Sequence, residues 1–221
     1  MDKLLDNKIL EQVVDFFSDL KNPVEIIYFS SKNDCQYCDE IGSLLTEVSG
    51  LSDLIHLQIK DYEEHVEERN QFGVKAAPVF IIVSKQGNQV VDHGIRYYGL
   101  PSGHEFSSLI NDIRLVSHGD SGLTPETRKF LADLKQPVHM QVFVTPTCPY
   151  CPQAVVLAHQ MALESPLVTA DMVEAMEFPE LSAQFNVSGV PQTTINLGAG
   201  TVVGAVHEHQ LIEKIQAALA I

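Results

Sequence analysis

The chain has 221 residues, 45% of them hydrophobic, and its 29 Asp and Glu against 14 Lys and Arg give a formal net charge of −15. This charge argues against nucleic acid as a partner, because such binding rests on neutralising phosphates with Lys and Arg. No apolar run approaches the roughly 20 residues that span a bilayer, and the N-terminus lacks the apolar core of a secretory signal. We expect a cytoplasmic protein with no membrane or nucleic-acid partner.

The first half of the chain alternates helical and strand-like patterns. Apolar residues three and four apart predict an amphipathic helix from Leu4 to Phe17, ending before Asn22-Pro23. Runs of β-branched and aromatic residues predict strands, and helical stretches separate them. In chain order we expect a strand at 24–29, a helix at 35–48, a strand at 54–59, a helix at 62–72, strands at 79–83 and 90–99, and a helix at 102–116.

The second half repeats this order. Thr124 is a predicted N-cap, Pro125 follows at the first helical position, and the sequence at 134–138 (LKQPV) repeats that at 20–24 (LKNPV). The polar, glycine-containing segment 118–123 is the predicted linker, so we expect an N-terminal unit at 1–117 and a C-terminal unit at 124–221, packed as a fixed pair. The second unit should contain strands at 140–144, at 167–173 and after Pro191, a helix after Cys148 and a last helix at 210–219.

Two Cys-x-x-Cys pairs lie at the same phase of this repeat. They are Cys35–Cys38 and Cys148–Cys151, and the first cysteines of the two pairs are 113 positions apart. Closely spaced cysteines in a reducing compartment are more often metal ligands or redox centres than structural disulfides. The repeat therefore indicates a duplicated redox unit.

The position of each pair suits nucleophilic thiol chemistry. Each pair follows a predicted strand and opens a predicted helix, where unpaired amides and the helix dipole favour a thiolate on Cys35 and Cys148. Cys38 and Cys151 lie one helical turn further on, so each can attack the mixed disulfide that its partner forms with a substrate.

Metal binding is the alternative of another class. Two such pairs supply the four thiolates of a tetrahedral zinc site, or a bridged iron–sulfur centre, in a binding module without catalysis. We expect no metal, because each pair opens an apolar helix within its own unit. The fragment His207-Glu208-His209 has nothing nearby to complete a metal site and is interpreted as a solvated turn or helix cap.

A proline follows the first cysteine of each pair by 43 positions, at Pro78 and Pro191. This repeated spacing favours a cis peptide bond beside each redox pair rather than an ordinary proline at a strand entry. A loop held in this way, with Ala77 or Val190 before the proline, can offer its backbone to an incoming polypeptide. Tyr37 and Tyr150 are expected to shape and cover the two sites.

The two pairs should differ in acidity. Asp34, Asp39 and Glu40 crowd the first pair, and negative neighbours disfavour a thiolate, whereas Thr145-Pro146-Thr147 and Pro152 surround the second pair with neutral residues. We expect Cys148 to be the more acidic thiol. Glu174 and Asp61 are candidates for relaying protons to the resolving cysteines, although a solvated acid is the alternative for each.

At these motifs the whole chain resembles the tandem thioredoxin-fold protein disulfide oxidoreductases, which are glutaredoxin-like proteins. The resemblance covers the stretches 35–38, 96–106, 143–152 and 171–175. It implies an α/β protein of two thioredoxin folds, each a mixed sheet flanked by helices, in one body. It also implies redox-active disulfides as the only resident redox groups, protein disulfides as substrates, and electrons from an NADPH-dependent, thioredoxin-reductase-like flavoenzyme.

Some positions depart from related patterns. Phe29 and Val142 stand six residues before Cys35 and Cys148, where plain thioredoxin has a buried Asp, so proton transfer must be arranged differently. The segment after Pro191, Leu197 to Gly200, is short and Gly-rich, and His207 replaces an aromatic residue usual in the family. The chain lacks the Gly-Gly and acidic pair with which glutaredoxins hold glutathione, so glutathione dependence is not expected.

The sequence therefore predicts an enzyme in which Cys148 attacks a substrate disulfide and Cys151 resolves the product, with Cys35 and Cys38 as a second, less reactive centre. The alternative within redox chemistry is an electron carrier to a peroxiredoxin. That role resembles the tandem N-terminal module of the alkyl hydroperoxide reductase flavoprotein, although the first unit of that module lacks its cysteine pair.

Overall fold

The computed structural model describes residues 4–33, 35–87 and 89–220. The first copy of the repeat, up to His118, contains four helices and four strands among these residues. In chain order they are α1 (Asn7–Phe16), β1 (Val24–Ser30), α2 (Cys38–Ser49), β2 (Ile55–Asp61), α3 (Val66–Gln71), β3 (Val79–Gln86), β4 (Gln89–Tyr98) and α4 (Phe106–His118).

The second copy, from Thr124 onward, repeats this order. Thr124 caps its first helix, as predicted, by accepting a hydrogen bond from the amide of Thr127 at 3.4 Å. The elements are α5 (Pro125–Ala132), β5 (Val138–Val144), α6 (Cys151–Glu164), β6 (Val168–Glu174), α7 (Pro179–Gln184), β7 (Gln192–Ile195), β8 (Gly200–Val203) and α8 (Glu208–Leu219).

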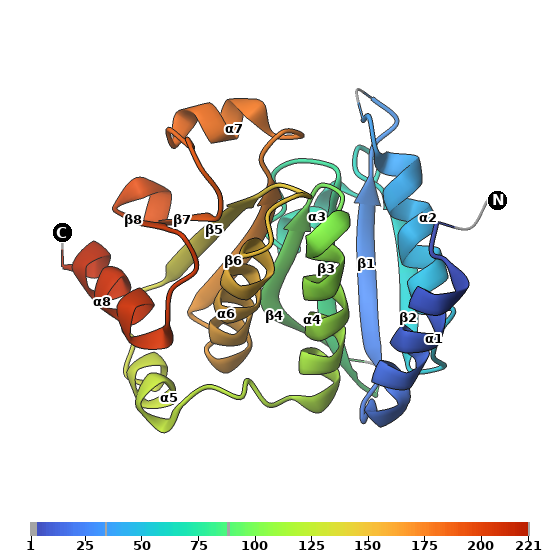
Figure 1. Ribbon diagram of the computed structural model, residues 1–221, viewed down its shortest axis with the longest axis horizontal. Helices are drawn as coiled ribbons and strands as arrows, with labels where there is room; N and C mark the ends of the chain where they lie inside the picture. Colours follow the sequence, from blue (N-terminus) through green and yellow to red (C-terminus); the bar gives the residue numbers. More distant parts are fainter. Residues whose placement is uncertain (1–3, 34, 88, 221) are drawn as a thin grey trace.

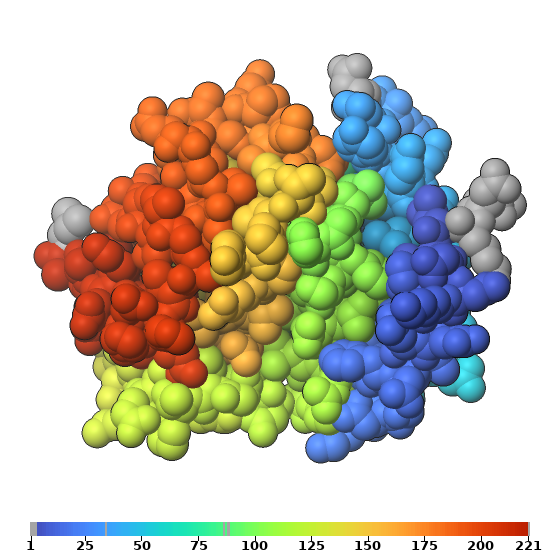
Figure 2. Space-filling view, in the orientation of Figure 1, coloured from blue at the N-terminus to red at the C-terminus, as the bar shows by residue number. Residues whose placement is uncertain are grey.

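All eight strands form one sheet, in the order β2-β1-β3-β4-β6-β5-β7-β8. The two copies join where β4 and β6 run parallel, with Ile95 opposite Ala170 and Tyr98 opposite Val173. The expected pair of thioredoxin folds is therefore one continuous α/β body. Figure 2 shows the two copies filling opposite halves of the molecule, with α4 and α6 meeting between them.

The sheet is covered unequally on its two faces. Helices α1, α2, α4 and α6 lie on one face, which Figure 1 shows in front of the strands. They bury an apolar cluster that includes Ile26, Tyr97 and Met172. Among the described residues, the other face carries only the six-residue helices α3 and α7, which pack on a smaller cluster around Phe29 and Phe143. The short helices leave part of that face of the sheet less covered.

A buried polar cluster ties the two copies together between α4 and α6. Asp112 of α4 and His159 of α6 are both fully buried, and Asp112 Oδ2 lies 2.5 Å from His159 Nδ1. The hydroxyl of Tyr97 donates to the same carboxylate oxygen. Because a buried polar group without partners is costly, this cluster favours one relative position of the copies.

Several boundaries differ from the predicted ones. Helix α3 begins at Val66, because residues 62–64 form a turn in which the Asp61 carboxylate accepts from the amides of Glu63 and Glu64, both at 3.0 Å. Helix α7 and strand β8 were not predicted, because a helix of six residues and a strand of four are too short to show a periodic pattern. No helix in the described parts of the chain combines the length and apolar character needed to cross a membrane.

Candidate redox sites

Each Cys-x-x-Cys pair forms a disulfide at a strand-to-helix junction. The Cα atoms are 5.6 Å apart in Cys35–Cys38 and 5.5 Å apart in Cys148–Cys151. The expectation that Cys35 and Cys148 begin their helices is wrong, because α2 and α6 begin at Cys38 and Cys151. In the second pair, Pro149 disfavours helical geometry at the residue before it, which is Cys148.

The first cysteine is the more accessible member of each pair. Cys35 is half-buried and Cys38 is 6% exposed, whereas Cys148 is 7% exposed and Cys151 fully buried. Within each pair this order is consistent with an attacking first cysteine and a resolving second one. Between the pairs, however, the first disulfide is the more exposed.

The peptide bonds before Pro78 and Pro191 are both cis, as predicted. Each proline carbonyl accepts a hydrogen bond from a glycine amide, Gly99 at 3.2 Å and Gly204 at 2.7 Å. These glycines have φ values of 94° and 87°, a region that a side chain disfavours. The two proline loops are therefore held by equivalent contacts.

The residues expected to contact substrate lie at the surface or near it. Ala77 and Val190 precede the cis prolines and are half-buried. The two tyrosines within the cysteine motifs occupy the N-cap positions of α2 and α6, where Tyr37 is half-buried and Tyr150 is 67% exposed. Their roles in substrate binding stay predictions.

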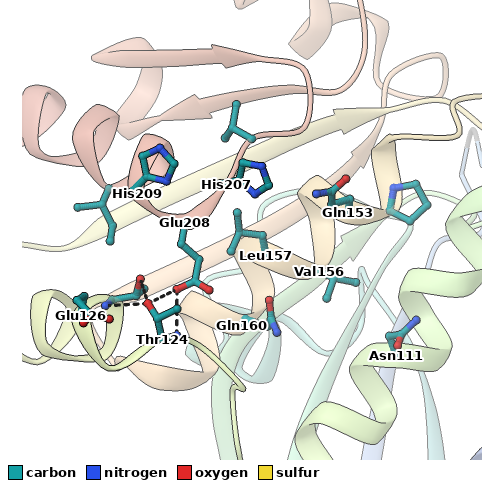
Figure 3. Close-up of a pocket in the computed structure, with 14 residues that line it drawn as sticks. Asn111, Thr124, Glu126, Gln153, Val156, Leu157, Gln160, His207, Glu208 and His209 are labelled. Carbon is teal, nitrogen blue, oxygen red and sulfur yellow. Dashed lines mark hydrogen bonds between the residues drawn. The ribbon is translucent and has the colours of Figure 1, made fainter.

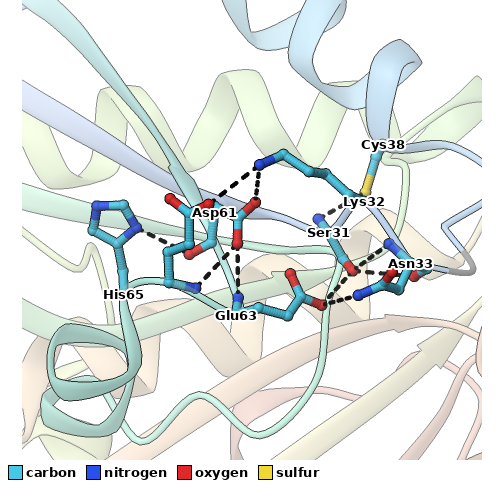
Figure 4. A network of polar contacts seen from close by, with 8 residues as sticks. Ser31, Lys32, Asn33, Cys38, Asp61, Glu63 and His65 are labelled. Carbon is cyan, nitrogen blue, oxygen red and sulfur yellow. Dashed lines mark hydrogen bonds and ion pairs between the residues drawn. The ribbon is translucent and has the colours of Figure 1, made fainter.

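A polar network surrounds the first disulfide, as Figure 4 shows. The amide of Ser31 lies 3.3 Å from Cys38 Sγ, and the Ser31 hydroxyl donates to the Glu63 carboxylate at 2.6 Å. Lys32 Nζ lies 2.8 Å from Asp61 Oδ2 and 3.4 Å from Glu64. Asp34, which was expected to crowd this pair, lies outside the described residues.

Asp61 and Glu174, the two candidates for proton relay, end the equivalent strands β2 and β6. The hydrogen bond from Lys32 lowers the pKa of Asp61, and the amides of Glu64 and Glu63 add to this effect. Burial instead raises the pKa of Glu174, whose Oε2 accepts from the amides of Met176 and Glu177 at 2.9 and 2.6 Å. The pKa values of these two equivalent carboxyls are therefore shifted in opposite directions.

The strand positions beneath the two sites differ as well. Phe29 and Val142, which are equally spaced from Cys35 and Cys148, face opposite sides of the sheet, because they belong to different clusters. Tyr28, rather than Phe29, faces α2, and its hydroxyl donates to the carbonyl of Cys38 at 2.9 Å. Burial raises the pKa of Tyr28 to about 12, so this hydroxyl stays protonated.

Two acids near the sites, the buried Glu105 and the half-buried Glu177, were missed by sequence reasoning, and each comes from the other copy of the repeat. Glu105 belongs to the first copy and directly follows His104. The amide of His104 donates to the carbonyl of Pro146, in the loop before Cys148, at 3.0 Å. Burial raises the pKa of Glu105 to about 7, although Ser108 donates a hydrogen bond to its carboxylate. Glu105 lies in the motif at 96–106, but nothing local to the sequence marks it as buried.

Glu177 of the second copy is the corresponding acid beside the first copy. Its carboxylate accepts from the amide of Leu100 at 2.7 Å, next to Gly99, which in turn bonds the carbonyl of Pro78. Burial raises its pKa to about 7, and the charges of Glu174 and Glu40 act in the same direction. Both sites are thus bordered by acids that can change protonation near pH 7.

The His207-Glu208-His209 fragment serves as the start of α8, as interpreted. His207 is its N-cap, and Glu208 accepts from the amide and hydroxyl of Thr124 at 3.1 and 2.8 Å. These residues border a surface cavity of about 910 Å³ beside α6 (Figure 3). Across the described ranges, no group of three or more His, Cys, Asp and Glu side chains is placed to hold a metal ion.

Comparisons with known proteins agree with this geometry. Residues 138–217 match the thioredoxin domain family. A solved structure of a protein disulfide oxidoreductase from Aeropyrum pernix is 29% identical, with a TM-score of 0.88, and the match covers 99% of this chain and 96% of that one. The NTD_N/C domain of alkyl hydroperoxide reductase AhpF from Enterococcus faecalis is 26% identical, with a TM-score of 0.87, covering 96% and 99%.

The curated relatives include the F component of alkyl hydroperoxide reductase from Staphylococcus aureus, 27% identical over 197 residues. That match covers 87% of this chain but 34% of the relative, so the chain spans about a third of the relative's length. Fold, paired cysteines and these similarities together define a thiol–disulfide oxidoreductase with tandem thioredoxin folds. Protein disulfide oxidoreductase and the paired N-terminal domains of AhpF both match the chain over nearly all its length.

Proposed function

We propose that the chain reduces, forms or rearranges disulfides in protein substrates through two dithiol–disulfide centres, with Cys148–Cys151 dominant. One observation carries this proposal: two disulfides lie at equivalent strand-to-helix junctions, each in a unit with a cis-proline loop. We keep the division into units at 1–117 and 124–221 with linker 118–123, and we place the reaction in the cytoplasm.

In the reducing direction, the Cys148 thiolate attacks one sulfur of a substrate disulfide. A mixed disulfide forms, and the other substrate sulfur leaves as a thiolate that takes up a proton. The Cys151 thiolate then attacks the sulfur of Cys148, which releases the second substrate thiol and leaves the Cys148–Cys151 disulfide. Two electrons have passed to the substrate, and we propose an NADPH-dependent flavoprotein reductase as the source that restores the dithiol.

The backbone and nearby acids support these steps. The loops at Ala77–Pro78 and Val190–Pro191 offer main-chain groups to an extended substrate, and Tyr37 and Tyr150 flank the sulfurs. Glu174 is the proposed proton relay for the second pair. Asp61 is the equivalent candidate at the first pair, and its ion pair with Lys32 must open before it can accept a proton.

Insulin reduction and oxidative refolding of ribonuclease test the proposal on Cys35→Ser, Cys148→Ser and the double variant. We expect Cys148→Ser to lose on the order of a hundredfold or more of the activity, because the nucleophile is removed. Cys35→Ser should keep most of it. Loss of activity in the double variant alone would show that the two centres are redundant and would refute the dominance of Cys148–Cys151. Stoichiometric zinc without activity would support a zinc-stabilised binding module instead.

Electron transfer to a peroxiredoxin is the second candidate, and the names of the curated relatives favour it. Unlike the family pattern described above, this chain has a cysteine pair in both copies. The test is NADPH oxidation in a mixture of a thioredoxin-reductase-like flavoenzyme, this protein, a peroxiredoxin and a hydroperoxide. Turnover that depends on Cys148 while insulin is left untouched would favour the carrier role.

A further inference from the structure

The glycine contacts of the two cis-proline loops are equivalent but have different surroundings. The carbonyl of Pro191 accepts from Gly204, which follows β8, the outer strand of the second copy. A Cβ added to Gly204 would meet nothing within 4 Å among the described residues. The carbonyl of Pro78 accepts from Gly99, which follows β4, inside the sheet and next to β6. The first loop therefore has the other copy of the repeat directly behind its supporting glycine.

The second copy packs tightly against Gly99. The φ of Gly99 is 94°, and a Cβ built on it would lie 2.8 Å from the Cβ of Glu174 and 2.8 Å from Oε1 of Glu177. Non-bonded carbon atoms pack best at about 3.5–4.0 Å. The backbone of Gly99 and the two glutamate side chains are therefore in contact, with no room between them for a further side chain.

The Glu177 carboxylate also bonds the residue after this glycine. Its Oε1 accepts from the amide of Leu100 at 2.7 Å. Leu100 and Glu177 are both half-buried, so water only partly replaces this bond when it is lost. The segment Gly99–Leu100 is thus bonded on one side to the carbonyl of Pro78, at 3.2 Å, and on the other side to the second copy.

The backbone of Glu177 is itself held in place. Its amide donates to Glu174 Oε2 at 2.6 Å, and the amide of Met176 donates to the same oxygen at 2.9 Å. Glu174 ends β6, which pairs with β4 as far as Tyr98 opposite Val173. The Glu177 side chain therefore starts from a backbone position that is fixed relative to β4.

We infer that Glu177 is a positioning residue for the first redox centre, because through Leu100 and Gly99 it fixes the Pro78 loop that binds the substrate backbone. The inference rests on the proposed function, since it concerns the loop through which that centre binds a polypeptide. Loss of the Glu177 contact should weaken binding of a peptide disulfide and have little effect on the reaction of Cys35 with a small disulfide.

Steady-state reduction of a dye-quenched peptide with a single disulfide tests this inference, with dithiothreitol as the electron donor. Glu177→Ala and Glu177→Gln are made in a Cys148→Ser/Cys151→Ser parent, in which only the first centre reacts. The glutamine amide oxygen can still accept from the amide of Leu100. Glu180→Ala, which removes an exposed acid of the same segment, is the matched control. The single-turnover reaction of the reduced proteins with dithiobis-nitrobenzoate, a disulfide without a peptide backbone, measures the sulfur chemistry alone.

We expect Glu177→Ala to raise KM for the peptide at least about fivefold with kcat nearly unchanged. Glu177→Gln should recover most of this loss, and Glu180→Ala should match the parent. The rates with dithiobis-nitrobenzoate should agree within about twofold in all of these proteins, because the position of the loop affects the peptide backbone and not the small disulfide. Circular dichroism confirms that each variant is folded.

Glu177→Ala in a Cys35→Ser/Cys38→Ser parent, in which only the second centre reacts, should leave KM unchanged, because Gly204 supports Pro191 from within the second copy. An unchanged KM at the first centre, an equal KM in Glu177→Ala and Glu177→Gln, or an equal loss at the second centre overturns the inference. Failure of the first centre alone to reduce the peptide also overturns it and leaves the proposed function standing. If both centres fail, the proposed function is wrong as well.

Discussion

The two disulfide sites occupy equivalent places in the repeat, but the residues that follow their strands differ. After β1 the chain presents Lys32, which pairs with Asp61 at 2.8 Å. After β5 it presents the neutral residues 145–147, and Glu174, the counterpart of Asp61, remains buried, with no cation paired to it among the described residues. The pKa of Asp61 is lowered and that of Glu174 is raised. Equivalent backbone positions thus hold two carboxyl groups whose pKa values are shifted in opposite directions, one by a neighbouring lysine and the other by burial.

The two sites also differ in how the other copy supports them. Beside the second site, the turn at Gly103 packs directly on the carbonyl of Pro146. Beside the first site, the Glu177 carboxylate accepts from the amide of Leu100, and the side chains of Glu174 and Glu177 lie against Gly99. The second site is therefore supported by a contact between two backbone segments, and the first is supported by side chains of the second copy.

Gly103→Ala should have the largest effect. A Cβ at Gly103 would overlap the carbonyl oxygen of Pro146, and the φ of Gly103 is 60°. We expect the free energy of unfolding in urea to fall by about 3 kcal/mol or more, because overpacking adds to the cost of positive φ. The variant should also slow reactions of Cys148 more than those of Cys35.

Gly119→Ala is the matched control, since Gly119 has a φ of 66° with nothing within 4 Å of an added Cβ. It should cost only about 1 kcal/mol, the conformational penalty alone. Equal losses in the two variants would show that the Gly103–Pro146 contact is not a tight one.

Glu105→Gln should change how stability depends on pH. Burial raises the pKa of Glu105 from 4.5 to about 7. A raised carboxyl pKa means that the folded state holds the proton more tightly, so its stabilising effect is complete below pH 4.5 and is lost as pH rises through 7. Relative to Glu105→Gln, the wild-type protein should lose about 3 kcal/mol between about pH 4.5 and about pH 8.

Urea unfolding at several pH values measures this difference, with exposed Glu126→Gln on α5 as the control. Parallel pH profiles for wild-type protein and Glu105→Gln would contradict a buried, proton-holding Glu105.

Local signals in the sequence were enough for much of the fold and for the sulfur chemistry. The cysteine pairs, the prolines and the longer strands carry their patterns within a few residues. Helix α7 and strand β8 were missed because six and four residues are too few to show a period. The surroundings of Glu105 and Glu177 could not be predicted from nearby residues, because each acid lies against the other copy of the repeat.

The positions beneath the sites show a different limit. Phe29 and Val142 were equated by counting back from the cysteines. Four residues, 31–34, separate β1 from Cys35, whereas three, 145–147, separate β5 from Cys148. A change of one residue moves a strand side chain to the opposite face. Tyr28 and Val142 are therefore the equivalent pair, and only the strand ends reveal it.

Thiol acidity is the next smaller difference between the sites. Helix α2 has Asp39 and Glu40 in its first turn, and α6 has no acidic residue there. We expect the pKa of Cys148 to lie about one unit below that of Cys35, because negative neighbours disfavour a thiolate. Alkylation against pH, on variants that retain one cysteine pair each, measures both values. A lower apparent pKa at Cys35 would contradict the prediction.

Lys32→Thr should have the smallest effect, because it removes one exposed cation from the loop before the first disulfide. The pair with Asp61 is mostly exposed on the lysine side, so stability at neutral pH should change little. The pKa of Asp61 should return toward its ordinary value. In the wild-type protein, the ion pair stabilises the fold above the ordinary pKa of Asp61, and this stabilisation is lost as pH falls through the lowered pKa. It should be absent from Lys32→Thr.

The same substitution should reduce the thiolate fraction of Cys35 by a factor of about two, because a nearby cation favours the charged form. The difference should shrink in high salt, which screens exposed charges. Lys8→Thr on α1, an exposed lysine of the same charge, is the control. If Lys32→Thr left the alkylation rate of Cys35 unchanged at low salt, the difference in acidity would have to come from the acids of α2 alone, and exchanging loop residues could not make the two sites alike.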